Sequence, residues 1–192
     1  AESQFDSWFH GELGNGLAAI GTETPATGTR CFNIGITNAN TSQTNHADFR
    51  SEQFSLGRAA KGRQPIAVSF AYKLLERVKP GDDLRVYLRY YDRAEGDFLD
   101  QTVIKLGSST ADTDMTRYKT ITITNIFAPT NAASADVWVS ANIDGPWTSG
   151  VAQFDDFSVR TIPSSPWVRV VIGAGLLGVL AASLFWTLRL WK

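Results

Sequence analysis

The amino-acid sequence predicts an all-β fold, an antiparallel β-sandwich, followed by one transmembrane α-helix. The chain between Thr29 and Arg160 consists of short β-rich runs separated by turn-forming residues. The chain then ends in a long apolar segment without charges. Charge also separates the two parts, because residues 164–192 hold three bases and no acid, whereas residues 1–163 hold 15 bases and 19 acids.

Eight β-rich runs are expected to form the sandwich. Turn-forming residues separate them, most clearly at 79–83, 94–96 and 144–147. Residues before Gly28 are rich in Gly and Thr and are expected to form a loop around one short strand. Eight short strands with regular turns favour a sandwich or jelly roll. The runs are TRCFNIGIT, FRSEQFSL, PIAVSFAYKLL, DLRVYLRYYD, DFLDQTVIKL, RYKTITITNIF, ADVWVSANI and VAQFDDFSVR.

Period-two alternation in three of these runs indicates which side chains enter the core. Apolar residues occupy every second position, so one face of each strand is expected to be buried and the other to meet solvent. The expected core rows are Val68, Phe70, Tyr72 and Leu74; Leu84, Val86, Leu88 and Tyr90; and Val137, Val139, Ala141 and Ile143.

The face opposite the second of these rows combines arginine with tyrosine, and a tryptophan points outward from a later strand. Flat aromatic side chains stack on sugar rings, and guanidinium groups bind hydroxyls. The same residue types also suit protein contacts, or the tyrosines simply cover the second face of the sandwich. The sequence leaves these three alternatives open. The candidate binding residues are Arg85, Tyr87, Arg89, Tyr91 and Trp138.

Catalytic and nucleic-acid-binding patterns are missing from the sequence. His10 and His46 are placed in separate polar loops, without a Cys or His companion at ligand spacing. No nucleophile-elbow serine and no phosphate loop before a helix are found. Cys31 is expected to be a buried strand residue, and the acidic balance of residues 1–163 argues against nucleic acid as a partner. We therefore expect a protein that is not an enzyme.

The carboxyl-terminal segment has the length of a membrane span. Residues 170–188 contain no charge, and a helix of that length covers about 28 Å, close to the thickness of the hydrocarbon layer. A buried core helix is the alternative, although such helices usually keep a polar stripe. The expected organisation is a sandwich at 1–160, a linker at 161–167, a transmembrane helix at 168–189 and a tail at 190–192.

The predicted span also suggests how it meets its surroundings. Small residues on one side let a partner helix approach closely, although such residues are common in lipid-facing anchors too. Tryptophans near both ends would fix its depth. No haem or pigment ligand is expected, because the span holds no His or acid. The small residues are Ala174, Gly175, Gly178, Ala182 and Ser183, and the interface tryptophans are Trp167, Trp186 and Trp191.

The expected localisation is the inner membrane of a bacterium, with the sandwich in the periplasm and the carboxyl terminus in the cytoplasm. Ala1 is the kind of residue that signal-peptide cleavage leaves, and trimming of the chain would leave the same start. Arg189 and Lys192 follow the span, while Arg169 alone precedes it closely. A tail-anchored protein with a cytosolic head is the alternative.

The order of the runs resembles the galactose-binding-like jelly roll, and within it the carbohydrate-binding modules attached to bacterial xylanases and glucanases. The resemblance covers about residues 4–160 and is carried by Phe5-Asp6, PIAVSFAYK, LRVYLRYYD and the closing run VAQFDDFSVR. It implies a structural calcium ion bound by Asp6 and Asp155, whereas the alternative is that Asp155 caps backbone amides. Alternation places Asp155 on one face with Phe157 and Val159, toward the core.

Together these features favour a non-catalytic accessory subunit of a bacterial membrane complex, whose partners are integral membrane proteins and the lipid bilayer. An energy-converting assembly, such as a photosynthetic reaction-centre or antenna complex, is one example of that class. The alternative is a membrane-tethered carbohydrate-binding module that holds cell-surface glycan.

Overall fold

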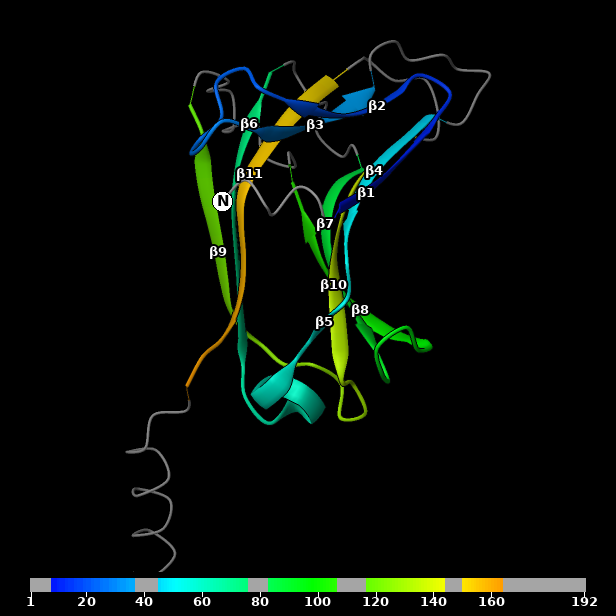
Figure 1. Cartoon of the computed structure of the whole chain (residues 1–192), viewed down its shortest axis with the longest axis vertical. Helices are drawn as coiled ribbons and strands as arrows, with labels where there is room; N and C mark the ends of the chain where they lie inside the picture. The colour runs from blue at the N-terminus through cyan, green and yellow to red at the C-terminus, as the bar shows by residue number, and fades with distance from the viewer. Residues whose placement is uncertain (1–7, 37–44, 76–82, 107–116, 144–149, 164–192) are drawn as a thin grey trace, which may run out of the picture. The chain divides into compact units, whose positions relative to one another are not determined.

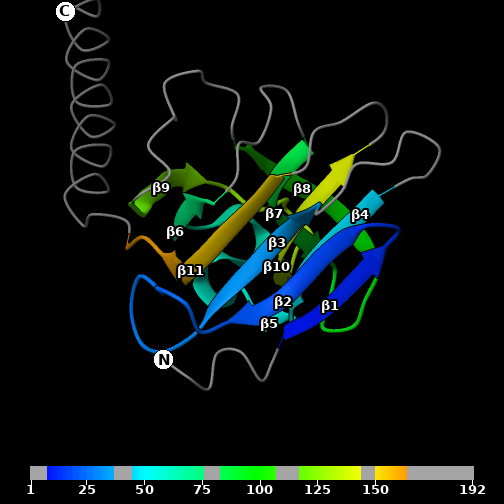
Figure 2. The ribbon, with the colours of Figure 1, turned by 90° about the horizontal axis from the view of Figure 1, so that it is seen from above.

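The computed structural model describes residues 8–36, 45–75, 83–106, 117–143 and 150–163. Eleven strands within these ranges form two antiparallel sheets that face each other (Figures 1 and 2). The all-β class and the antiparallel sandwich are therefore confirmed. The chain divides into two units, Ala1–Thr161 and Ile162–Lys192, and the strands all belong to the first.

Sheet A has the strand order β1-β4-β10-β7-β8, and the short β5 pairs with β10. Its neighbouring strands are antiparallel throughout. The chain enters and leaves this sheet several times, so residues far apart in sequence meet across it. Its strands are β1 Trp8–Leu13, β4 Asn45–Ser51, β5 Phe54–Ser55, β7 Asp83–Tyr91, β8 Phe98–Lys105 and β10 Ser134–Ile143.

Sheet B has the strand order β2-β3-β11-β6-β9. A 3-10 segment, η2 at Gly57–Gly62, lies between β5 and β6. The last strand, β11, occupies the centre of sheet B, so the closing run of the sandwich is held on both sides. Its strands are β2 Gly16–Gly21, β3 Cys31–Ile36, β6 Ile66–Leu74, β9 Lys119–Ile126 and β11 Gly150–Thr161.

The core lies between the sheets and contains the rows that alternation predicts. The rows from β6 and β7 are buried in full, and so are Val137, Val139 and Ala141 of β10. The fourth member of the last row, Ile143, has a side chain outside the described set. Cys31 is fully buried as expected, and burial raises the pKa of its thiol.

The amino-terminal region differs from the prediction, because it contains two strands rather than a loop around one. β1 pairs with β4 at one edge of sheet A, and β2 pairs with β3 at one edge of sheet B. Gly14, with a φ of 63°, lets the chain turn sharply between them. Glu12 Oε1 then accepts a hydrogen bond from the Ala18 backbone N–H at 2.6 Å, which ties the two strands together.

The histidines also lie in strands rather than in the polar loops expected for them. His10 is in β1 and His46 is near the start of β4. β4 begins at Asn45, whose buried Oδ1 accepts a hydrogen bond from the Asn15 backbone N–H at 2.9 Å. This contact between distant residues holds the first residue of β4, a strand whose sequence is mostly polar.

The closing strand corrects the predicted face of Asp155. A register shift between Asp155 and Ser158 marks a β-bulge, and Asp156 has a φ of 54°. The bulge turns both Phe154 and Phe157 toward the core, although they are three residues apart. Asp155 therefore does not share a face with Phe157, because simple alternation fails across the bulge.

The predicted membrane-facing features fall outside the described residues. These are the transmembrane helix at 168–189, its small-residue side, its three tryptophans and the tail at 190–192. Among the residues that are described, no helix is both long enough and apolar enough to cross a bilayer. β11 runs to Thr161, one residue past the predicted end of the sandwich at 160.

Candidate functional site

The structure brings all five predicted binding residues to one surface, the side of sheet A that points away from sheet B. The register pairs Trp138 of β10 with Tyr87 of β7 and with Arg50 of β4, so these residues share that side. We call it the outer face of sheet A. Its described polar and aromatic residues on β4, β7, β8 and β10 include His46, Asp48, Arg50, Arg85, Tyr87, Arg89, Tyr91, Lys105, Asp136 and Trp138.

An aromatic pair lies at the centre of this face. The rings of Tyr87 and Trp138 are stacked, with centroids 4.8 Å apart and planes at 29°. The Arg89 guanidinium carbon lies 4.8 Å from the centroid of the Trp138 ring, close enough for a cation–π contact. Tyr87 is buried, while Trp138 is only partly buried. Tyr87 thus supports the indole, and part of the indole remains accessible.

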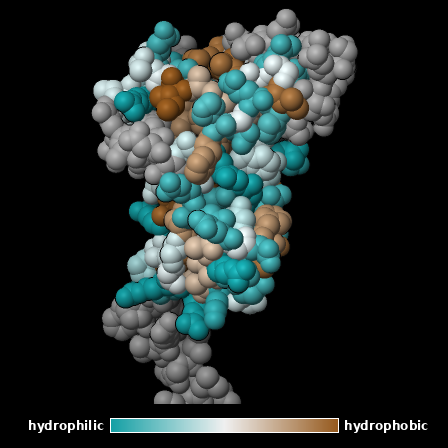
Figure 3. All heavy atoms as spheres, turned by 45° about the vertical axis from the view of Figure 1, so that its right-hand side comes forward, coloured by the Kyte–Doolittle hydropathy of each residue, from teal (hydrophilic) through white to brown (hydrophobic). Residues whose placement is uncertain are grey.

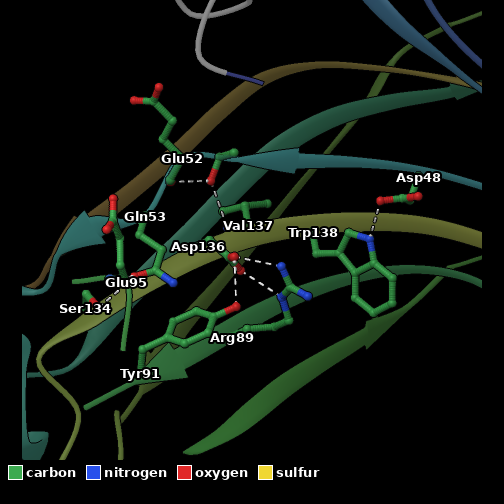
Figure 4. A network of polar contacts seen from close by, with 11 residues as sticks. Asp48, Glu52, Gln53, Arg89, Tyr91, Glu95, Ser134, Asp136, Val137 and Trp138 are labelled. Atoms are coloured by element: carbon green, nitrogen blue, oxygen red, sulfur yellow. Dashed lines mark hydrogen bonds and ion pairs between the residues drawn. The ribbon is translucent and has the colours of Figure 1, made fainter. Parts of the chain in front are cut away.

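Asp48 fixes the orientation of that indole. The Trp138 indole Nε1–H donates to Asp48 Oδ2 at 2.9 Å (Figure 4), and His46 Nε2 lies 3.0 Å from Asp48 Oδ1. Burial acts to raise the pKa of Asp48, but hydrogen bonds from His46 and Trp138 outweigh it, so the pKa lies below its ordinary value. The ionised carboxylate therefore holds a histidine and a tryptophan in place.

Asp136 forms a second, more deeply buried network beside the first. Its side chain accepts two hydrogen bonds from Arg89, at 2.8 and 2.7 Å, and one from the Tyr91 hydroxyl at 2.9 Å (Figure 4). Asp136 is only 1% exposed, so its charge depends on these donors. Burial and the neighbouring Asp136 carboxylate raise the pKa of Tyr91, which keeps its hydroxyl protonated as a donor.

The two tyrosines are more covered than a free binding surface would require. Tyr87 and Tyr91 are each 8% exposed. This burial agrees with the alternative in which the tyrosines cover the second face of the sandwich. The groups of the central region that remain accessible are therefore the Trp138 indole and the charged side chains around it.

Exposed apolar side chains lie at the two edges of the same sheet. Phe9 and Leu13 are exposed on β1, and Phe98 and Val103 are exposed on β8. Arg50 lies over the Phe9 ring, with its guanidinium carbon 5.4 Å from the centroid. Figure 3 shows hydrophobic residues on this side of the molecule as separate patches among hydrophilic ones. The surface is therefore mixed rather than broadly apolar.

The other predicted site residue within the described ranges is Asp155, on sheet B. Its Oδ2 accepts the Thr27 backbone N–H at 3.0 Å, and its Oδ1 accepts the Asp156 backbone N–H at 2.7 Å. The carboxylate therefore caps backbone amides, as the second of the two alternatives states. Calcium needs about six to eight oxygen ligands, and the described residues contain no group of three or more His, Cys, Asp or Glu side chains that could hold a metal.

The described side chains near Asp155 therefore do not supply enough oxygen ligands to bind a calcium ion by themselves. The second predicted ligand, Asp6, lies outside the described residues. The calcium hypothesis for Asp6 and Asp155 accordingly stays a prediction from the family resemblance.

Sequence reasoning missed Asp48 and Asp136 as members of this face. Asp136 stands two residues before Trp138 in a clearly alternating run, so alternation alone could have placed it beside the tryptophan. Asp48 gave a weaker signal, because its run was assigned to a loop. Its contact with Trp138 joins residues 90 positions apart in sequence.

Comparisons with known proteins identify the fold. Neither the family models nor the curated sequences include a match to this chain. Among solved structures, the enzymatically active domain of bacteriophage CBA120 tailspike protein 4 has a TM-score of 0.56 at 14% identity, covering 83% of this chain and 20% of that one. The CBM22-1–GH10 modules of Clostridium thermocellum xylanase 10B, complexed with xylohexaose, have a TM-score of 0.51 at 18% identity, covering 84% and 27%.

A third solved structure comes from a study of promiscuous specificity in carbohydrate-binding modules of the β-sandwich superfamily. Its TM-score is 0.50 at 11% identity, and the match covers 80% of this chain and 57% of that one. This chain thus spans well under two thirds of each of the three solved chains. At these identities the likeness shows the fold alone, a β-sandwich of the kind found in carbohydrate-binding modules.

Proposed function

We propose that this sandwich is a non-catalytic carbohydrate-binding module that holds its glycan on the outer face of sheet A. The observation that carries the proposal is the partly accessible Trp138 indole, stacked on Tyr87 and oriented by Asp48. An aromatic plane held rigidly beside charged hydrogen-bonding groups suits a sugar ring, which has an apolar face and a polar rim. The β-sandwich fold shared with carbohydrate-binding modules supports the same function.

These likenesses favour glycan binding over the accessory-subunit interpretation, which rests on the sequence of the carboxyl-terminal segment. A helix at 168–189 would tether the module to a bilayer, and this part of the proposal depends on the apolar run alone. The solved chains also include a tailspike enzymatic domain and a glycoside hydrolase module. We propose that this chain has neither activity.

Replacing Trp138 by Ala is expected to weaken polysaccharide binding about tenfold or more, which corresponds to about 1.4 kcal/mol. The substitution removes the stacking surface and leaves Asp48 without its indole donor. Affinity electrophoresis of the full chain against a panel of soluble plant and bacterial polysaccharides, xylan included, measures the effect.

The matched control is Phe127→Ala, because Phe127 is an aromatic side chain with 59% exposure outside sheet A. This variant should bind like the wild type, and thermal melting should show that both variants are folded. Equal binding by the Trp138→Ala variant and the wild type, or failure of the wild type to bind any polysaccharide, contradicts the proposal.

A further inference from the structure

We infer that the glycan bound by the outer face of sheet A is anionic, a polysaccharide that carries carboxylate or sulfate groups. This inference rests on the proposed function and adds to it the chemical class of the ligand.

The described side chains of this face carry more positive than negative charge. Four are permanently cationic (Arg50, Arg85, Arg89 and Lys105) and two are acidic (Asp48 and Asp136), which gives 4 − 2 = +2. The whole chain, in contrast, has a formal net charge of −1, with 18 bases and 19 acids. A cationic face on a slightly acidic protein favours an anionic ligand.

The two acidic side chains described on this face, Asp48 and Asp136, are already engaged within the protein. Asp136 uses its two carboxylate oxygens to accept hydrogen bonds from Arg89, and Asp48 uses its two for His46 and Trp138. In the described part of the chain, neither Arg50 nor Lys105 forms an ion pair. The surplus of positive charge therefore belongs to side chains that can turn toward a ligand.

The strand register places this surplus on both sides of the aromatic pair. Arg50 of β4 is the cross-strand partner of Trp138, and Lys105 of β8 is two residues from the partner of Tyr87. Adjacent strands are about 4.8 Å apart, so β4 and β8 are separated by about 14 Å. That distance is wider than one sugar ring, so a polymer with repeated negative charges could contact both cations while a ring stacks on the indole.

The test compares charged polysaccharides with neutral forms of the same backbone. The probes are polygalacturonate against its methyl ester, and sulfated dextran against dextran, each titrated into the full chain in mild detergent. We expect the anionic member of at least one pair to bind about tenfold more tightly, and this preference to fall in about 0.5 M NaCl, where charges are strongly screened. Which pair shows the preference identifies the anion as carboxylate or sulfate.

The double variant Arg50→Gln, Lys105→Gln is expected to lose about tenfold in affinity for the anionic polymer and to keep its affinity for the neutral one. Arg160→Gln is the matched control, because Arg160 is an exposed arginine on β11 of sheet B. It should change neither affinity. Thermal melting shows whether each variant is folded.

Equal binding of charged and neutral polymers, without an effect of salt, overturns the inference and leaves glycan binding intact. A double variant that binds the anionic polymer like the wild type also overturns it. Absence of binding to every polysaccharide contradicts the proposed function itself, so the two failures are distinguishable.

Discussion

Replacing Asp136 by Ala is expected to lower the free energy of unfolding by about 3–5 kcal/mol, the cost of removing one partner from a buried ion pair. Asp136 is 1% exposed and accepts hydrogen bonds from Arg89 and Tyr91. Without the carboxylate, the Arg89 charge and the Tyr91 hydroxyl lose their partner in a poorly hydrated place. Urea unfolding followed by tryptophan fluorescence measures the change.

Two controls separate the network from the general effect of losing an acid. Asp97→Ala removes an exposed carboxylate from the connection between β7 and β8, and should change stability by less than about 0.5 kcal/mol. Asp136→Asn keeps the shape and part of the hydrogen bonding, and should fall between the other two. A loss in Asp136→Ala no larger than that in Asp97→Ala contradicts the network.

Phe49→Ala is the second substitution with a large expected effect, also about 3–5 kcal/mol, because it leaves a cavity in the core. Phe49 of sheet A is 1% exposed, and its ring centroid lies 4.5 Å from that of Phe32 in sheet B. The pair therefore joins the two sheets directly. The loss should be measured by urea unfolding, as for Asp136.

Phe127→Ala is again the matched control, since it removes the same ring from an exposed position. We expect a change of less than about 0.5 kcal/mol there. If the two substitutions cost the same, the ring of Phe49 does not contribute to a core shared by both sheets.

Alternation in the sequence was sufficient to predict the fold class, the core rows and five of the residues on the outer face of sheet A. These predictions are local, because each strand alone determines which of its residues share a face. Arg85, Tyr87, Arg89 and Tyr91 could be placed on one face of a strand for that reason, whereas their position beside Trp138 follows from the pairing of β7 with β10. Alternation also accounts for the buried rows of β6, β7 and β10.

Other features depend on contacts between distant parts of the chain. The strand pairings that bring Asp48 to Trp138 and Asp136 to Arg89 follow from the sheet order β4-β10-β7, which no local pattern contains. The bulge at Asp156 interrupts alternation with a positive φ in a residue other than glycine. β1 and β2 are edge strands of mixed composition, so their burial pattern is weak.

The most direct test of the carbohydrate-binding face is the NMR signal of the Trp138 indole Nε1–H, assigned with a Trp138→Phe variant. In the free protein this group donates to Asp48 on the outer face of sheet A. Titration with the oligosaccharide of the tightest-binding polymer should shift this signal in proportion to occupancy, and more than the indole signal of Trp8, which packs against the core. A saturating titration that leaves the Trp138 signal unchanged would show that the glycan does not bind on this face.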